Sequence, residues 1–316
     1  MPRIRVLLSI IWILALAACA DRSAEGPAPI RIGYIPISDN AQMYVAIEQG
    51  YFQQEGLNVE LRSMSGGPRI IEALVSMGSE KIDIGYSNVV SIIAARAQGF
   101  PVVAIAGGPI ETPGRPTHAV LVRADSAIKS VKDLQGKTLA VNALRNIDHI
   151  MLLRYLEAGG VDTAGIKLVE VPFPQMENVL LTSTVDAAAT IEPFMTFALK
   201  RDSIRVLDHH YAVVEPRTVV GSYLTTEQWL GSNQDSARRF VAALGKATEF
   251  IRSDQQATRR MLVKYTQVDA ETTAAMQLTE FQEQHQASDI QRWIEEMVRW
   301  KMISAPVEVS AVFRGF

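Results

Sequence analysis

The chain has 316 residues, 48% of them hydrophobic and 21% charged, a composition typical of a globular protein long enough for two domains of ordinary size. Its formal net charge is −3 and it has no cluster of Lys and Arg, which argues against a nucleic-acid partner. A single cysteine, Cys19, excludes an intramolecular disulfide.

The first 18 residues have the features of a secretory signal. Arg3 and Arg5 precede an apolar run, Val6 to Ala15, that is too short to span a bilayer as a stable helix. Leu16-Ala17-Ala18-Cys19 resembles the bacterial lipobox, whose cysteine is lipidated and becomes the first mature residue. We therefore expect a lipoprotein anchored through Cys19. An ordinary signal with a chance cysteine would give the same pattern.

Strands and helices alternate after a small, polar, proline-bearing tether at 19–29. Strands are predicted at 30–35, 57–62, 82–86 and 102–106. Helices are predicted at 41–49, from Pro68 to Met77, and from the Ser87-Asn88 cap to Gln98. This interval between strands is typical of parallel βαβ units.

The alternation resumes beyond a proline-rich break at 109–116. Strands are predicted at 118–123, 138–141, 166–171, 186–191 and 218–224, and helices at 147–158, around Asn178 and from Pro193. From Thr226 on, the sequence predicts only helices, at 235–253, 255–265, 270–285 and 288–301. The pattern thus indicates two α/β blocks, 30–117 and 118–220, and a helical tail.

Polar or small residues stand at nearly every junction between a strand and the following helix. They are Ser38-Asp39-Asn40, Ser65-Gly66-Gly67, Tyr86-Ser87-Asn88, Asn142 to Asn146, and Glu192. Helix capping alone explains each set. Together they favour a cleft between two lobes, because ligands of parallel α/β sheets lie beyond the carboxyl ends of the strands. Arg145 indicates an anionic ligand group there, unless it is a solvated surface arginine.

Several segments resemble a known family. Residues 46–60 (AIEQGYFQQEGLNVE) are similar to the opening signature of solute-binding proteins of the sulfonate, nitrate and taurine ABC-transporter group, a family that also includes riboflavin-type and thiamine-pyrimidine binders. Further matches are Gly78 with Ile82-Asp83-Ile84-Gly85, residues 131–141 (VKDLQGKTLAV), Asp186-Ala187-Ala188 and Glu192-Pro193-Phe194. The resemblance covers about residues 30–225 in the expected order.

This resemblance implies an α/β, two-lobed periplasmic-binding-protein fold of type II, with two hinge crossovers and a C-terminal helical segment. Lobe 1 would comprise 30–117 plus 221–316, and lobe 2 would comprise 118–220. His118–Arg123 and Thr218–Leu224 would act as the hinge, and the tail would complete lobe 1.

The resemblance also implies a ligand site in the cleft. Its residues would be Tyr34, Asp39, Asn40, Ser65, Gly66, Tyr86, Ser87, Asn88, Asn142, Arg145, Asn146 and Glu192. One departure concerns the second lobe, where sulfonate binders often carry a Ser/Thr-rich helix start. Here that position has Leu144-Arg145-Asn146-Ile147-Asp148, which argues against a simple alkanesulfonate.

The expected function is capture of a small organic anion, of sulfonate or carboxylate type, and its delivery to an ABC transporter permease. We expect a monomer on the periplasmic or cell-surface side of the membrane. A neutral heterocycle such as a pyrimidine, stacked between Tyr34 and Tyr86, is the second candidate ligand. The sequence is also compatible with a lyase of the same fold that acts on a menaquinone precursor, and with a ligand-sensing lipoprotein.

Catalytic and metal motifs have little support in the sequence. The five histidines show no zinc-binding spacing. A Gly-x-Ser-x-Gly elbow and a Walker-type Gly-Lys-Ser/Thr are absent, and the cysteine is assigned to the lipid. We therefore expect a protein that is not an enzyme and that uses no metal or cofactor.

Overall fold

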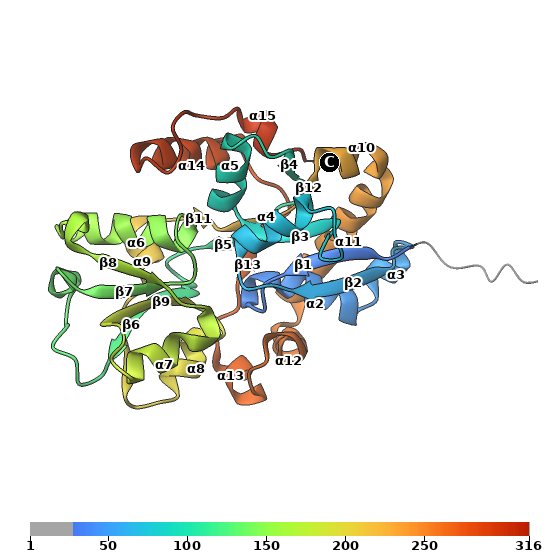
Figure 1. Ribbon diagram of the computed structural model, residues 1–316. Helices are drawn as coiled ribbons and strands as arrows, with labels where there is room; N and C mark the ends of the chain where they lie inside the picture. Colours follow the sequence, from blue (N-terminus) through green and yellow to red (C-terminus); the bar gives the residue numbers. More distant parts are fainter. Residues whose placement is uncertain (1–27, 316) are drawn as a thin grey trace, which may run out of the picture.

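The computed structural model describes residues 28–315, so the predicted signal, Cys19 and most of the tether lie outside the described residues. Two five-stranded sheets stand side by side, joined by a small three-stranded sheet between them (Figure 1). Among residues 28–315, no helix is long and apolar enough to cross a membrane.

The first sheet has the strand order β2-β1-β3-β12-β4. Its strands are β1 (Ile30–Tyr34), β2 (Val59–Ser63), β3 (Ile84–Asn88), β4 (Val102–Ala104) and β12 (Gly221–Thr226). The helices between them are η2 (Ser38–Asn40), α2 (Ala41–Glu48), α3 (Tyr51–Gln54), α4 (Gly67–Val75) and α5 (Val89–Ala97). β1 is parallel to β2 and β3, whereas β12 is antiparallel to β3 and β4. The sheet is therefore mixed, which corrects the expectation of parallel units alone.

Glycine in two neighbouring strands lets α4 lie directly on this sheet. A Cβ at Gly85 would come within 2.3 Å of Ile70 in α4, and a Cβ at Gly33 within 2.9 Å of the same side chain. Both distances are shorter than van der Waals contact, so the close approach of helix and sheet requires glycine.

The second sheet has the order β10-β6-β9-β7-β8. Its strands are β6 (His118–Arg123), β7 (Thr138–Val141), β8 (Lys167–Glu170), β9 (Ala187–Ile191) and β10 (Ile204–Asp208). Its helices are η3 (Val131–Leu134), α6 (Ile147–Ala158), η4 (Thr163–Gly165), η5 (Phe173–Gln175), α7 (Met176–Leu181), α8 (Phe194–Leu199) and α9 (His210–Val214). β7 is parallel to β8 and β9, and β6 is antiparallel to β9 and β10. β10 and α9 were not predicted.

The chain passes between the two sheets through the small sheet β11-β5-β13. β5 (Pro109–Glu111) lies in the predicted proline-rich break, and β11 (Thr218–Val219) pairs with it antiparallel. Of the two segments expected to act as the hinge, His118–Arg123 is paired within the second sheet. The other, predicted as one strand at 218–224, divides at Val220 between the small sheet and β12, which corrects its extent.

The C-terminal part is mostly helical and packs on the first sheet's helices. Its elements are α10 (Glu227–Ser232), α11 (Gln234–Ser253), α12 (Gln255–Thr266), α13 (Ala270–Ala275), β13 (Glu280–Phe281), α14 (Ala287–Arg299) and α15 (Val309–Val312). α11 and α12 contact α2, α14 contacts α5, and α15 contacts β4. The predicted helix 270–285 ends ten residues early, because the backbone at Glu280 and Phe281 pairs with β5. Pairing with a distant strand outweighs the local helical preference there.

Candidate functional site

A small pocket lies where the two five-stranded sheets meet the crossing sheet. It is lined from both sides by polar and apolar residues, namely Ile35, Ile37, Asp39, Tyr86, Asn88, His118, Asn142, Asn146, Ile147, Asp148, Phe173, Ile191 and Val220. Its cavity volume is about 20 Å³, which is room for about one water molecule. A solute of several heavy atoms therefore fits only when the walls move apart.

Asp39, at the η2 turn after β1, forms the first-sheet side of the pocket. It is fully buried, and its Oδ2 accepts a hydrogen bond from the Tyr86 hydroxyl at 3.1 Å. The Thr279 hydroxyl, which comes from the segment before β13, lies 3.1 Å from Asp39 Oδ1 and 2.9 Å from Ser38 Oγ. Burial raises the pKa of Asp39 to about 6, although the His118 charge and these two hydroxyls act in the opposite direction.

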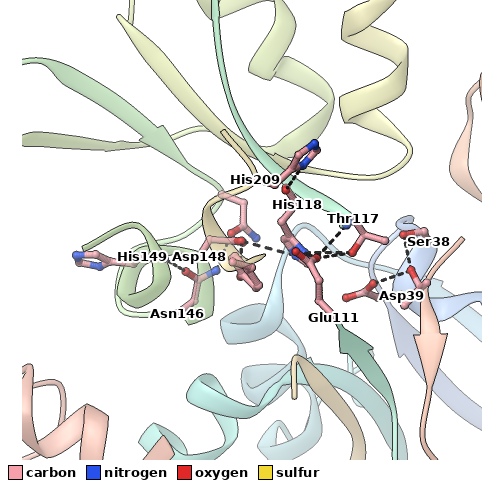
Figure 2. A network of polar contacts seen from close by, with 12 residues as sticks. Ser38, Asp39, Glu111, Thr117, His118, Asn146, Asp148, His149 and His209 are labelled. Atoms are coloured by element: carbon pink, nitrogen blue, oxygen red, sulfur yellow. Dashed lines mark hydrogen bonds and ion pairs between the residues drawn. The ribbon is translucent and has the colours of Figure 1, made fainter. Parts of the chain in front are cut away.

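Glu111 and His118 form a buried ion pair, here called the floor pair, of which His118 lines the pocket (Figure 2). Glu111 Oε2 lies 2.6 Å from His118 Nδ1 and accepts hydrogen bonds from the backbone and hydroxyl of Thr117. Burial alone would lower the pKa of His118, but the Glu111 carboxylate, with Asp148 and Asp39, raises it to about 9. The imidazole therefore carries a positive charge at neutral pH.

The start of α6 forms the second-sheet side. Asn146 caps the helix, because its Oδ1 accepts a hydrogen bond from the His149 backbone N–H at 3.0 Å. Its Nδ2 donates to Asn142 Oδ1 at 2.6 Å. Asp148, in the first turn, accepts from the Tyr211 hydroxyl at 2.8 Å and lies 3.9 Å from His118 Nε2. Burial raises the pKa of Asp148, against the opposing effect of the His118 charge.

Asn88 lines the pocket at the end of β3. Its Oδ1 caps α5 by accepting a hydrogen bond from the Ser91 backbone, and its Nδ2 is an amide donor. A Cβ at Gly67 would lie 2.8 Å from this nitrogen and 2.5 Å from Ser87 Oγ. Gly67 therefore leaves the space that these two polar side chains occupy.

Five of the predicted site residues line this pocket, namely Asp39, Tyr86, Asn88, Asn142 and Asn146. Gly66 lies nearby, since a Cβ on it would be 3.8 Å from Asn142 Nδ2. The structure brings these residues together from four of the five predicted junctions between strands and helices.

The remaining predicted residues lie outside the lining. Asn40 is buried and donates to the Ile35 carbonyl, and Ser87 is buried beside Gly67. Ser65 lines a different, outer groove beside Arg62 and Arg69. Tyr34 packs edge-on against Tyr44 at a ring-centroid distance of 5.8 Å, so it does not form a stacking pair with Tyr86 across this pocket.

Glu192 is buried at the end of β9 and caps α8 through Thr196. Its carboxylate also accepts a hydrogen bond from the Gln277 backbone at 3.2 Å, and its carbonyl accepts one from the Ser38 backbone at 3.0 Å. Glu192 thus joins the second sheet to the C-terminal segment and to the η2 turn, rather than lining the pocket.

The Arg145 guanidinium does not face the pocket. It donates to the Met302 carbonyl and lines an outer groove with Lys301 and Ile303. Arg145 has a φ of 60°, in the left-handed region, which redirects its side chain away from the start of α6. The structure therefore places this arginine outside the pocket. This corrects the expectation that Arg145 binds an anionic group of the ligand.

Sequence reasoning missed eight of the lining residues. They are Ile35, Ile37, His118, Ile147, Asp148, Phe173, Ile191 and Val220. An acid in the first turn of a helix is ordinary at a positive helix end, so Asp148 gave no separate signal. His118 directly follows the segment that crosses between the sheets, and this position is the sequence signal that could have identified it as a pocket residue.

The pocket lining combines several kinds of polar group with apolar walls. Among the described residues, no lysine or arginine lines the pocket, and no group of His, Cys, Asp and Glu is arranged to hold a metal ion. The lining offers two carboxylates, one imidazolium, amide groups and apolar walls. A solute with several hydrogen-bonding groups and an apolar body matches that set.

Comparisons with known proteins agree with this architecture. Residues 37–258 match the family model described as NMT1/THI5 like. The chain is 26% identical over 262 residues to a putative aliphatic sulfonates-binding protein of Escherichia coli, covering 82% of this chain and 78% of that protein. It is 22% identical over 235 residues to 4-amino-5-hydroxymethyl-2-methylpyrimidine phosphate synthase of Aspergillus parasiticus, covering 69% and 64%.

Among solved structures, the ligand-binding component of an ABC-type import system from Staphylococcus aureus, with zinc bound, superposes with a TM-score of 0.78 at 16% identity. The alignment covers 92% of this chain and 97% of that one. This likeness confirms the expected fold. Since the family match spans more than half of the sequence, the chain belongs to the NMT1/THI5-like family and has the fold of the periplasmic binding proteins.

Proposed function

We propose that this protein captures a small solute between two lobes and delivers it to the permease of an ABC importer. The observation that carries the proposal is the pocket, whose lining comes from both five-stranded sheets at the point where the chain crosses between them. The relatives named as binding proteins and as an import component support the same function.

In this proposal, residues 30–117 plus 221–316 form one lobe and residues 118–220 form the other. Opening exposes Asp39, Tyr86 and Asn88 on one wall and Asn142, Asn146 and Asp148 on the other. A solute that contacts both walls stabilises the closed form, and the crossing segments absorb the rotation. The permease then recognises the closed pair of lobes.

The test combines binding with shape. A thermal-shift panel of amines, pyrimidines, carboxylates and sulfonates identifies binders, because a ligand specific to the folded state raises its apparent stability. Small-angle scattering with the best binder should then give a smaller radius of gyration than without it. An unchanged radius despite confirmed binding would contradict closure.

The synthase relative makes an enzyme the second candidate. His118 is the histidine in the pocket, and its raised pKa of about 9 makes it a poor general base at neutral pH. A binding protein returns its solute chemically unchanged. Mass spectrometry of the released compound after prolonged incubation therefore separates the two functions.

We propose further that Cys19 is lipidated and holds the protein on the periplasmic or cell-surface side of the membrane. Cys19→Ser should release the protein to the soluble fraction or leave an unprocessed precursor. A mature N-terminus at Ala20 or later, unmodified by mass spectrometry, would rule this out.

A further inference from the structure

We infer that the solute carries a positively charged nitrogen group, such as an ammonium, an amidinium or a protonated heterocycle, held between Asp39 and Asp148. The inference rests on the proposed function, since it concerns the same pocket. It departs from the organic anion that the sequence predicts.

The balance of charge around the pocket is negative. Asp39 and Asp148 approach it from opposite walls, on either side of the Glu111–His118 pair (Figure 2). His118 provides the one positive charge among the described lining residues, and Glu111, 2.6 Å from its Nδ1, already neutralises it. With all four groups ionised, three carboxylates face one imidazolium, a net charge of −2.

The two lining carboxylates are also poorly solvated. Asp39 is 1% exposed and Asp148 is 3% exposed, and burial raises the pKa of both. Their hydrogen bonds come from the neutral hydroxyls of Tyr86, Thr279 and Tyr211. The nearby positive charge is the His118 imidazolium, 3.9 Å from Asp148, which is already paired with Glu111. A cation placed between the two carboxylates would supply the missing counter-charge, and an anion there would be repelled by both.

The remaining lining fits the body of such a solute. Ile37, Ile147 and Phe173 give apolar walls, and the amides of Asn88 and Asn142 give neutral hydrogen-bonding groups. The one arginine predicted to bind an anion, Arg145, is bonded to the Met302 carbonyl outside the pocket. An organic cation with a flat or aliphatic apolar part matches this combination.

Two sets of compounds that differ in charge but not in size test the inference. The first is benzamidine, benzamide and benzoate, and the second is butylamine, butyramide and butyrate. Calorimetry on the full chain in detergent at pH 7.5 should show each cation binding at least tenfold more tightly than its neutral analogue, and no binding of either carboxylate. Lowering the pH from 7.5 to 5 should weaken cation binding, because Asp39 becomes protonated as the pH falls through about 6.

Variants identify the groups responsible. Asp148→Asn should reduce the affinity for the cation at least tenfold while leaving that for benzamide unchanged. Asp39→Asn should do the same, which provides a second test if one variant folds poorly. Asp125→Asn removes one negative charge from an exposed loop residue and should leave all affinities unchanged.

The outcomes separate this inference from the function on which it rests. If benzoate or benzenesulfonate binds more tightly than the cation, and Asp148→Asn strengthens that binding, the charge assignment is wrong and the solute-binding function stands. If charge makes no difference to affinity, the assignment is likewise wrong. If no compound of any charge binds in a broad panel, the solute-binding function itself is contradicted.

Discussion

Two of the ion pairs that join residues 30–117 and 221–316 to residues 118–220 differ strongly in their exposure to water. At the pocket floor, Glu111 and His118 are 2% and 1% exposed and share a 2.6 Å contact. At the rim, where α14 lies above α6 in Figure 1, Arg299 pairs with Glu157 and both side chains are about half exposed. Solvent and salt screen the rim pair and leave the floor pair unscreened. Breaking the floor pair should therefore cost severalfold more unfolding free energy than breaking the rim pair.

Glu111→Gln should have the largest effect. It leaves the buried His118 charge without its main partner, and breaking a buried pair on one side costs about 3–5 kcal/mol of unfolding free energy. Urea denaturation at pH 7 measures the loss. A change below 1 kcal/mol would place the floor pair in the same class as the rim pair.

The pH dependence of stability should follow His118. Its pKa of about 9 in the folded protein lies above the ordinary value of 6.5, so its stabilising contribution is complete below pH 6.5 and is lost as the pH rises through 9. The difference between these two pKa values corresponds to about 3 kcal/mol. Denaturation between pH 6.5 and 9.5 should show this decline, and His118→Gln should flatten it.

Asp39→Asn should have an effect of opposite sign. The pKa of Asp39 is raised to about 6 from 3.8, so ionised Asp39 opposes folding at pH 7.5 by about 2–3 kcal/mol. Asparagine keeps an oxygen for Tyr86 and carries no charge. The variant should therefore be more stable at pH 7.5 by about 2 kcal/mol, with the gain disappearing below pH 4. A loss of stability at pH 7.5 would contradict the ionised state assigned to Asp39.

Arg299→Gln at the rim should change stability least. An exposed ion pair contributes at most about 1 kcal/mol, and 0.5 M salt should remove most of that. Because Arg299 also contacts Glu296, Glu157→Gln provides the matched control from the opposite helix. A loss above about 2 kcal/mol for either variant would contradict the weak contribution expected of an exposed ion pair.

Most of the alternation of strands and helices was predictable from local pattern. The predicted elements 118–123, 138–141 and 147–158 match β6, β7 and α6 residue for residue. The strands that were missed, β5, β10 and β13, form antiparallel pairs with strands distant in the sequence. Because these strands are stabilised by distant partners, the residues adjacent to them in the sequence give little indication of a strand.

For the pocket, the positions of the residues were predictable from the sequence, whereas the directions of their side chains were not. Asp39, Asn88 and Asn146 stand at junctions whose position the fold class determines, and the structure places them in one pocket. The direction of a side chain depends on the local backbone conformation and on contacts with distant residues. Arg145 shares its loop with Asn142, yet a left-handed backbone and the Met302 carbonyl turn it outward. Composition and spacing contain neither fact.

The third strand of the crossing sheet determines where the molecule can bend. β13 pairs with β5, and its neighbours Gln282 and Glu283 bond to Gly108 and Gly107, so the near end of the crossing is fixed to the C-terminal segment. In the proposed rotation of the lobes, the bend of this crossing would then lie farther along, within residues 112–117. Glu111 spans that connection by bonding Thr117 and His118 at its far end. In the proposed opening, this one carboxylate would hold the two ends of the bend together.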